Sequence, residues 1–446
     1  MTIQSPEQIT SSSVAANREA YLAKLLKLAQ SAELPTGQGF SELRSQAAAL
    51  VQEQTFPTTR NEEWRVTDLS ALLQVELTFG DRSSAISPEA VQSFAFPEAA
   101  ESRLVFVNGV YAPELSAIAN LPTNLFVGNL AALPEELKAR SQNYLAKQPG
   151  AEEVFTALNT AGLNDAAVVW IPRNQEVAAP IHLLFVSTAS DRPILSQPRC
   201  LVVAETGSSV TLVEDYVTVG EGVYLTNPVT EIWVEQNAQV SHTRMQRDSQ
   251  TAFHIGKTAV SQARDSRYTC NAVGFGAKLS RHNLEVFQIG EQTETNLNGL
   301  TLMGGDQLGD THSTIAYTQP HGTSRQLHKT IVDDQARAVF NGKVFVPKLA
   351  QLTDAGQLNR NLLLSPKARV DTKPQLEITA DNVKCSHGAT VGQIDPDEIF
   401  YLQSRGLDQT SARQLLVYAF AIEIIDQIPV ASVRDHLSQL VKQRAF

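Results

Sequence analysis

One short segment of the sequence carries two chemically active side chains close together: VKCSHGATVG, from Val383 to Gly392. Cys385 and His387 are two residues apart, so both side chains lie on the same face if the segment is extended. A thiolate and an imidazole can hold iron or zinc, and a thiolate can also carry a persulfide. A complete metal site needs two or three more ligands, and none lies nearby in the sequence. The missing ligands would have to come from distant turns or from another chain.

The same pair also has a purely structural interpretation. Cys385 would then be a small buried hydrophobic residue, and His387 a hydrogen-bonded one. Spacing alone favours this interpretation, because a single Cys-x-His pair is a weak motif. Two further cysteines, Cys200 and Cys270, border strand-like apolar runs and are predicted to be core residues.

Three histidines, His312, His321 and His328, fall within a short stretch of the chain. A histidine cluster can bind a metal ion, although histidines in a strand-rich region are more often surface or ladder residues. The glycine-rich piece Met303-Gly304-Gly305-Asp306 lacks the lysine and serine of a phosphate-binding loop, and no dinucleotide or hydrolase motif is present. The sequence therefore predicts a non-catalytic protein that does not bind ATP itself.

Composition limits the class of protein. The 446 residues are 42% hydrophobic and 19% charged, which is typical of a folded protein with more than one structural unit. The net charge of -11 opposes binding to nucleic acid or to an anionic membrane surface. Three sparse cysteines favour a reducing compartment, and no stretch resembles a signal peptide or a membrane span. We expect a cytoplasmic protein without a membrane partner or a nucleic-acid partner.

The pattern of apolar residues divides the chain into four regions. Residues 1–100 show helical spacing, 101–165 are mixed, 166–392 consist of short strand-like runs, and 393–446 return to helix. The strand-like runs recur about every ten residues with few tight hairpin signals. A sandwich, a barrel and a solenoid all fit this pattern. The length of the strand-rich region and its polar stretches favour a parallel β-helix.

Two features mark the C-terminal helices. Asp395 suits the cap of a helix, Pro396 its first turn and Gly406 its end. From Leu415 to Ile425 apolar residues occupy nearly every side of the next predicted helix, so more than one of its faces must be covered.

The block from Phe340 to Phe420 resembles the SufB/SufD family of the SUF iron-sulfur cluster assembly machinery. The similarity runs through FNGKVFVPKLAQLTDAGQLNRNLLLSPKARVDTKPQLEI and ADNVKCSHGATVGQIDPDEIFYLQSRGL. The CSHGATVG form and the earlier FPTTRNEEWRVTDL resemble the SufD branch of that family. This resemblance implies a mainly β fold: a central right-handed parallel β-helix flanked by N-terminal and C-terminal α-helical domains.

The resemblance also implies partners and a site. It implies a scaffold that pairs with a SufB-like paralogue through the β-helices and docks a SufC-like ABC ATPase on its C-terminal helical region. The sequence leaves open whether the isolated chain is a homodimer or a monomer. ATP-driven dimerisation of that ATPase would shift the paired scaffolds and expose their interface. At that interface His387, together with Cys385, would take part in assembling an iron-sulfur cluster. The cluster would be transient, and this chain alone would bind no cofactor stably. His387 would be a metal ligand in a site shared with the partner chain. The expected contacts with the ATPase are Phe400, Tyr401, Leu402, Arg405 and Gly406.

Two alternatives from other classes remain open at this point. Parallel β-helices also carry polysaccharide-active enzymes, which place carboxylates in a groove along the solenoid. A free-standing homodimer could instead bind metal through His312, His321 and His328.

Overall fold

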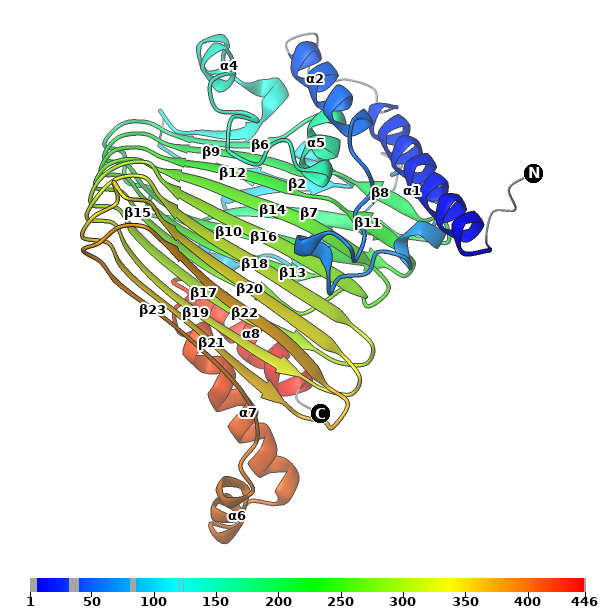
Figure 1. The fold of residues 1–446 in the computed structure, drawn as a ribbon. Helices are drawn as coiled ribbons and strands as arrows, with labels where there is room; N and C mark the ends of the chain where they lie inside the picture. The colour runs from blue at the N-terminus through cyan, green and yellow to red at the C-terminus, as the bar shows by residue number, and fades with distance from the viewer. Residues whose placement is uncertain (1–5, 32–39, 81–85, 120, 123, 445–446) are drawn as a thin grey trace.

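The computed structural model describes residues 6–31, 40–80, 86–119, 121–122 and 124–444. Within these ranges no helix is both long enough and apolar enough to cross a lipid bilayer. The molecule is dominated by a stack of long strands, with helices at its two ends (Figure 1).

The strands form a parallel β-helix, as the sequence predicts, and it has about eight turns. Successive long strands alternate between two sheets, so every turn adds one strand to each sheet. Sheet A contains, in spatial order, β22 (Arg369–Ile378), β20 (Arg337–Val346), β18 (Leu308–Tyr317), β16 (Leu279–Gln288), β14 (Phe253–Gln262), β12 (Val229–Val234), β9 (Arg199–Ala204), β6 (Ala167–Ile171) and β5 (Phe126–Asn129). Sheet B contains β23 (Lys384–Gln393), β21 (Asp354–Leu363), β19 (Thr323–Val332), β17 (Glu294–Met303), β15 (Arg267–Gly274), β13 (Gln239–Arg247), β10 (Ser209–Gly220), β7 (Ile181–Ala189), β2 (Ser102–Val107) and β3 (Val110–Tyr111).

Shorter strands extend the sheets at the N-terminal end. β1 (Thr78–Phe79), β8 (Ile194–Ser196) and β11 (Tyr224–Thr226) join sheet A, and β4 (Ala117–Ile118) pairs with β2. The two-residue turn between β2 and β3 is Asn108-Gly109, and both residues have positive φ, at 51° and 84°. Asn-Gly is the preferred sequence for such a turn.

Alternation along each strand separates the inside of the solenoid from the outside. In β16, Leu284 and Val286 are buried in the interior core, whereas Glu285 between them forms an ion pair outside. Cys200 and Cys270 lie in the same core, as predicted, and are 1% and 0% exposed. Neighbouring side chains of a strand point to opposite faces, so this pattern identifies the inward residues of every turn.

One corner of the solenoid repeats the same backbone conformation from turn to turn. The φ angles of this corner lie between 56° and 63°, in the left-handed region, at Asn237, Asp265, Gln292, His321 and Leu352. The N–H of each donates to a carbonyl of the next turn, as in His321 to Gln351 and Leu352 to Asn382, at 2.9 and 2.7 Å. Asn and Asp tolerate this region best, so the corners account for many of the turn signals in the sequence.

Helices cover both sheets from outside. α1 (Pro6–Gln30), α2 (Ser41–Gln52) and α5 (Val154–Ala161) pack together at the N-terminal end, with α3 (Pro88–Gln92) and α4 (Glu135–Ser141) nearby in the chain. At the other end, α7 (Gln409–Ile425) and α8 (Ala431–Arg444) pack on the outer face of sheet B. The buried side of α7 includes Val417, Ala421 and Ile424, while Leu415 stays exposed.

The interior also holds a buried ion pair. Glu214 on β10 contacts Nε2 of His242 on β13 at 2.7 Å and accepts hydrogen bonds from Thr230 and Tyr216. Burial alone would raise the pKa of Glu214, but the hydrogen bond and charge of His242 outweigh it and lower that pKa to about 2. Burial lowers the pKa of His242, but hydrogen bonds with Cys270 and Glu214 raise it to about 9. The pair is therefore charged at neutral pH.

Other interior histidines are held neutral. Burial lowers the pKa of His254, of His282 and of His328, the last to about 4. An unfolded histidine titrates near pH 6.5, so between about pH 6.5 and 4 the folded chain binds fewer protons than the unfolded chain. The free energy of unfolding must therefore fall as the pH falls through this window.

We predict that the free energy of unfolding falls between pH 7 and pH 5, and that His328 alone accounts for about 2 kcal/mol of this loss. Urea unfolding at the two pH values measures this loss. The substitution His328→Gln takes away one titrating group and should make the pH dependence shallower. An identical dependence in wild type and variant would contradict the prediction.

Candidate site at the open end of the β-helix

The last turn of the solenoid is uncovered. Beyond β22 and β23 no described strand continues either sheet, so each of these ten-residue strands presents one unpaired backbone edge. Most of the β23 side chains are exposed. Long open edges of this kind are usually blocked in isolated proteins because they pair readily with another chain.

β23 carries both Cys385 and His387. Their register partners on β21 are Ala355 and Gln357, which are buried in the interior of the preceding turn. Cys385 and His387 therefore lie on the inward face of β23, and because no turn follows, that face is open at the end of the solenoid. The spacing argument made from the sequence is confirmed: the two side chains share one face.

The two side chains differ in environment. Cys385 is half-buried and packs against the interior core, and burial raises the pKa of its thiol. His387 is exposed at the rim. At neutral pH Cys385 is accordingly a protonated thiol rather than a nucleophilic thiolate, and the imidazole of His387 is the more available ligand.

Beneath these residues the interior is polar, which the sequence did not indicate. Several buried side-chain atoms in the last turns have no hydrogen-bond partner among the described residues: Gln326 Nε2, His328 Nε2, Gln357 Nε2 and Oε1, Asn361 Oδ1 and Thr372 Oγ1. Buried polar groups are normally paired, so ordered water or another chain would have to supply partners for these atoms. Across the described residues no group of three His, Cys, Asp or Glu side chains is arranged to hold a metal ion. A metal ion bound at His387 or Cys385 would therefore need further ligands from outside the described residues.

Next along the chain, α6 (Pro396–Ser404) projects away from the solenoid (Figure 1). Its start follows the predicted rules: Asp395 accepts a hydrogen bond from the Asp397 N–H at 2.9 Å, and Pro396 occupies the first turn. Gly406, just past the end, has φ +96°, a conformation that favours glycine.

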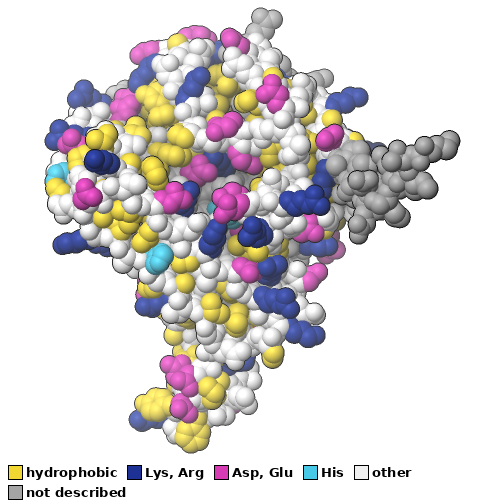
Figure 2. All heavy atoms as spheres, in the orientation of Figure 1, with side chains coloured by type: hydrophobic (Ala, Val, Ile, Leu, Met, Phe, Trp, Pro, Cys, Tyr) yellow, Lys and Arg dark blue, Asp and Glu magenta, His cyan; other side chains and the backbone are white. Residues whose placement is uncertain are grey.

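The surface of α6 is unusually apolar for an exposed helix. Phe400 and Tyr401 are 71% and 57% exposed, and the Arg405 guanidinium lies 5.3 Å from the Tyr401 ring centre. Leu402 is partly buried, and no residue of the helix is fully buried. Hydrophobic side chains gather visibly at this projecting tip (Figure 2). An exposed aromatic patch on a protruding element is typical of a binding surface.

The three clustered histidines do not come together. His312 lies on the outside of β18, with its Nδ1 3.2 Å from the Glu63 carboxylate. His321 occupies one of the left-handed corners described above. His328 points into the interior, with its ring centre 4.6 Å from that of Phe340. Their separation removes the geometric basis for a metal site built from these three residues.

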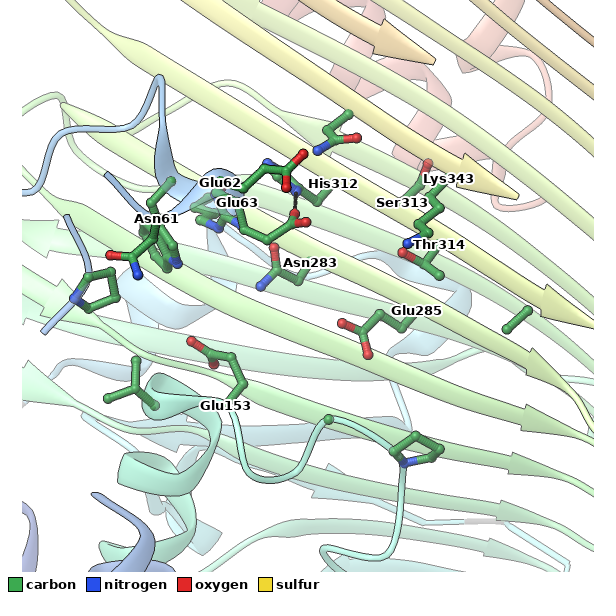
Figure 3. Close-up of a pocket in the computed structure, with 18 of the residues that line it drawn as sticks. Asn61, Glu62, Glu63, Glu153, Asn283, Glu285, His312, Ser313, Thr314 and Lys343 are labelled. Carbon is green, nitrogen blue, oxygen red and sulfur yellow. Dashed lines mark hydrogen bonds and ion pairs between the residues drawn. The ribbon is translucent and has the colours of Figure 1, made fainter. Parts of the chain in front are cut away.

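Figure 3 shows a groove that lies between the outer face of sheet A and residues 53–64. The groove has a volume of about 1080 Å³. The FPTTRNEEWRVTDL segment forms one wall of the groove and is held against sheet A by two contacts. The Arg281 guanidinium lies 4.0 Å from the Trp64 ring centre, and the Thr67 hydroxyl donates a hydrogen bond to the Asp310 carboxylate at 2.6 Å. In the structure this segment fixes the N-terminal helices to the solenoid.

The groove is lined by carboxylates, as in a β-helical polysaccharide enzyme, but several of them are engaged in ion pairs. Glu285 pairs with Lys257 at 2.8 Å, and Glu377 pairs with Lys343 at 2.7 Å. A hydrogen bond from His312 lowers the pKa of Glu63. A glycosidase needs a carboxylic acid with a raised pKa, so the Glu63 environment is the opposite of what that chemistry requires.

Comparison with known proteins identifies the family. A model described as "SUF system FeS cluster assembly, SufBD core domain" matches residues 185–420, and one described as "SufBD protein N-terminal region" matches 17–183. The chain belongs to the SufB/SufD family. The core model spans β23 and α6, and so covers all the predicted site residues. The individual roles of those residues stay predictions.

Of three relatives of this SufB/SufD chain, two have names that refer to iron-sulfur cluster assembly. It is 50% identical over 411 residues to an iron-sulfur cluster assembly SufBD family protein of Synechocystis sp., with 90% of each chain covered. It is 34% identical over 461 residues to the chloroplastic protein ABCI7 of Arabidopsis thaliana, covering 99% of this chain and 95% of that one. Over 392 residues it is 32% identical to the iron-sulfur cluster assembly protein SufD of Escherichia coli, covering 87% and 89%.

Proposed function

We propose that this chain is a non-catalytic scaffold of the SUF machinery, on which an iron-sulfur cluster is assembled as cargo at a junction with a second subunit. The observation that carries the proposal is the open end of the solenoid. It combines two unpaired ten-residue strand edges with an exposed imidazole and a half-buried thiol. One surface thus offers both a means of attaching a partner and part of a ligand set.

The partner at the open end is a SufB-like paralogue. A second β-helix can continue both sheets through main-chain hydrogen bonds, and would bring its own ligands close to His387 and Cys385. In the absence of the paralogue, a second copy of this chain presents the same edges, so a homodimer is the expected form of the isolated protein. The three free cysteines, Cys200, Cys270 and Cys385, fit a reducing compartment such as the cytoplasm.

The second partner is a SufC-like ABC ATPase, which docks on α6. The exposed rings of Phe400 and Tyr401 supply the apolar centre of that surface, and Leu402, Arg405 and Gly406 border it. Aromatic side chains surrounded by polar ones are the usual anchors of a protein interface. In this arrangement the ATPase supplies the chemical energy by dimerising on ATP, and the movement reaches the cluster-assembly junction through α6 and the adjoining β23.

We predict that Phe400→Asp lowers the affinity for the ATPase at least tenfold without lowering the melting temperature. A buried aromatic anchor in an interface is commonly worth 2 kcal/mol or more, whereas the same side chain in the free protein faces water. Isothermal titration with the ATPase measures the affinity.

Leu349→Asp provides a matched control, because Leu349 is equally exposed, at 75%, and belongs to a β-helix turn rather than to α6. Equal loss of affinity in both variants would show that general surface charge is responsible, and would contradict docking on α6.

The proposal as a whole is tested by co-expressing this chain with a SufB-like and a SufC-like protein and purifying it anaerobically. Recovery of a complex of all three proteins containing iron and sulfide supports the scaffold role. A chain that is recovered alone, without either protein, would overturn it.

A further inference from the structure

A small cavity lies inside the solenoid, between sheets A and B in the middle turns. Strands β13, β15 and β17 of sheet B and strands β14, β16 and β18 of sheet A line it. Its volume is about 30 Å³, which gives room for one or two water-sized species at about 10–15 Å³ each. Three of these strands carry a glycine on the cavity wall, namely Gly274, Gly299 and Gly309. The chemistry of the other lining side chains decides what this cavity can hold.

The cavity wall includes a buried guanidinium, that of Arg244 on β13, which is 4% exposed. Its Nη2 donates to Nε2 of His254 at 2.6 Å, and Nδ1 of that imidazole donates to Asp248 at 2.8 Å. The Tyr216 ring centre lies 5.0 Å from the guanidinium carbon. Among the described residues no carboxylate forms an ion pair with Arg244, because the imidazole separates it from Asp248. A buried cation is stabilised by a contacting anion, and Arg244 has the capacity to bind one.

A second donor in the cavity wall is His282 on β16. Its Nε2 lies 3.0 Å from the Thr258 hydroxyl, and its Nδ1 has no hydrogen-bond partner among the described residues. When Thr258 donates to Nε2, the imidazole hydrogen lies on Nδ1, where it can be donated to a ligand. Burial lowers the pKa of His282, and the positive charge of Arg244 lowers it further. The potential around this imidazole is therefore positive, and Thr301 and Thr311 add hydroxyl donors to the same wall.

We propose that this cavity is a binding site for one small monovalent inorganic anion, which the Arg244 guanidinium and the His282 imidazole hold by donated hydrogen bonds. The lining favours an anion over water, because a water molecule also needs acceptors and these two groups supply only donors. A hydrogen bond between charged groups is roughly twice as strong as a neutral one. Chloride and hydrosulfide share the charge and size that fit this cavity. The site does not depend on the proposed function, although hydrosulfide as its ligand would connect the two.

Bromide is the probe for this site, because it has the same charge and scatters X-rays anomalously. In crystals of the chain soaked in sodium bromide, we expect an anomalous peak in contact with Arg244. Gly274→Ala should abolish this peak, because the added Cβ takes up space in the cavity wall and meets only Gln246 Oε1, at 3.8 Å. Gly304→Ala is the matched control: its Cβ has similar room, 3.7 Å from Asp334 Oδ2, and lies outside the cavity.

The melting temperature tests the same site in solution. Sodium bromide should raise it by about 1–2 °C more than sodium gluconate of equal ionic strength, because gluconate is too large for the cavity. The difference should persist in Gly304→Ala and vanish in Gly274→Ala and in Arg244→Met, which removes the charge. Gly274→Ala keeps the test decisive if Arg244→Met fails to fold. Equal melting temperatures of the wild type in the two salts would overturn the inference, as would a full bromide peak in folded Gly274→Ala.

Competition identifies the natural ligand. Crystals loaded with bromide are transferred to equal concentrations of sodium chloride or sodium hydrosulfide, and the anion that binds more tightly removes more of the bromide peak. Loss of the peak in either solution supports the site. A peak that survives both would show an adventitious ion only and would overturn the inference.

Discussion

Replacing His387 with alanine is expected to lower the iron and sulfide recovered with the three-protein complex by about tenfold or more, while all three proteins still co-purify. His387 is exposed on the open face of β23, so its loss removes a ligand without creating a cavity in the core. Removing even a supporting group of a metal site commonly costs ten- to a hundredfold, and a direct ligand should cost at least as much. Anaerobic purification followed by iron and acid-labile sulfide analysis measures the effect.

His321→Asn is the matched control for this variant. His321 is another exposed histidine of the same solenoid, and asparagine tolerates its left-handed corner, where φ is 63°. Cluster content should stay at the wild-type level in this variant. Full cluster content in the His387→Ala complex would show that the open end is not where assembly takes place.

The largest expected loss of stability comes from Glu214→Ala, which should lower the free energy of unfolding by about 3–5 kcal/mol. The substitution leaves the buried His242 imidazolium without its carboxylate partner, and also deprives Thr230 and Tyr216 of their acceptor. An unpaired buried charge is far more costly than a lost surface interaction. Urea unfolding at pH 7 measures the change.

Two further variants show whether the unpaired charge is the cause. Glu221→Ala, in an exposed loop after β10, should change stability by no more than about 0.5 kcal/mol. The double variant Glu214→Gln with His242→Gln should lose less free energy of unfolding than the sum of the losses in the two single variants. The reason is that the double variant leaves no unpaired buried charge. Strict additivity of the two changes would contradict the buried ion pair.

Much of the architecture was predictable because local chemistry determines it. Asn108-Gly109 predicts a tight turn, and both residues adopt the positive φ that such a turn needs. Asp395 and Gly406 predict the bounds of α6, since capping and left-handed termination depend on neighbouring residues alone. The apolar excess in α7 predicts burial on more than one face, which sheet B and α8 provide.

The polar interior beneath the site was not predictable, because it depends on register between distant turns. Gln326, Gln357 and His387 form one column, but the number of residues from one partner to the next changes from turn to turn. No fixed period in the sequence marks such a column. The separation of His312 and His328 follows from the same cause: they are close in sequence, but one faces outward and the other inward.

Because the corner repeats from turn to turn, the length of the solenoid is set by its number of turns. Every turn adds one strand to each sheet and joins its neighbour by the same corner hydrogen bond, so a turn is a unit of length of about 4.8 Å. Inserting or deleting a whole turn would move the open end by that step relative to the N-terminal helices and leave every other corner intact. The distance between the two ends of the molecule is thus set in discrete steps by turn number, independently of the residues that work at either end.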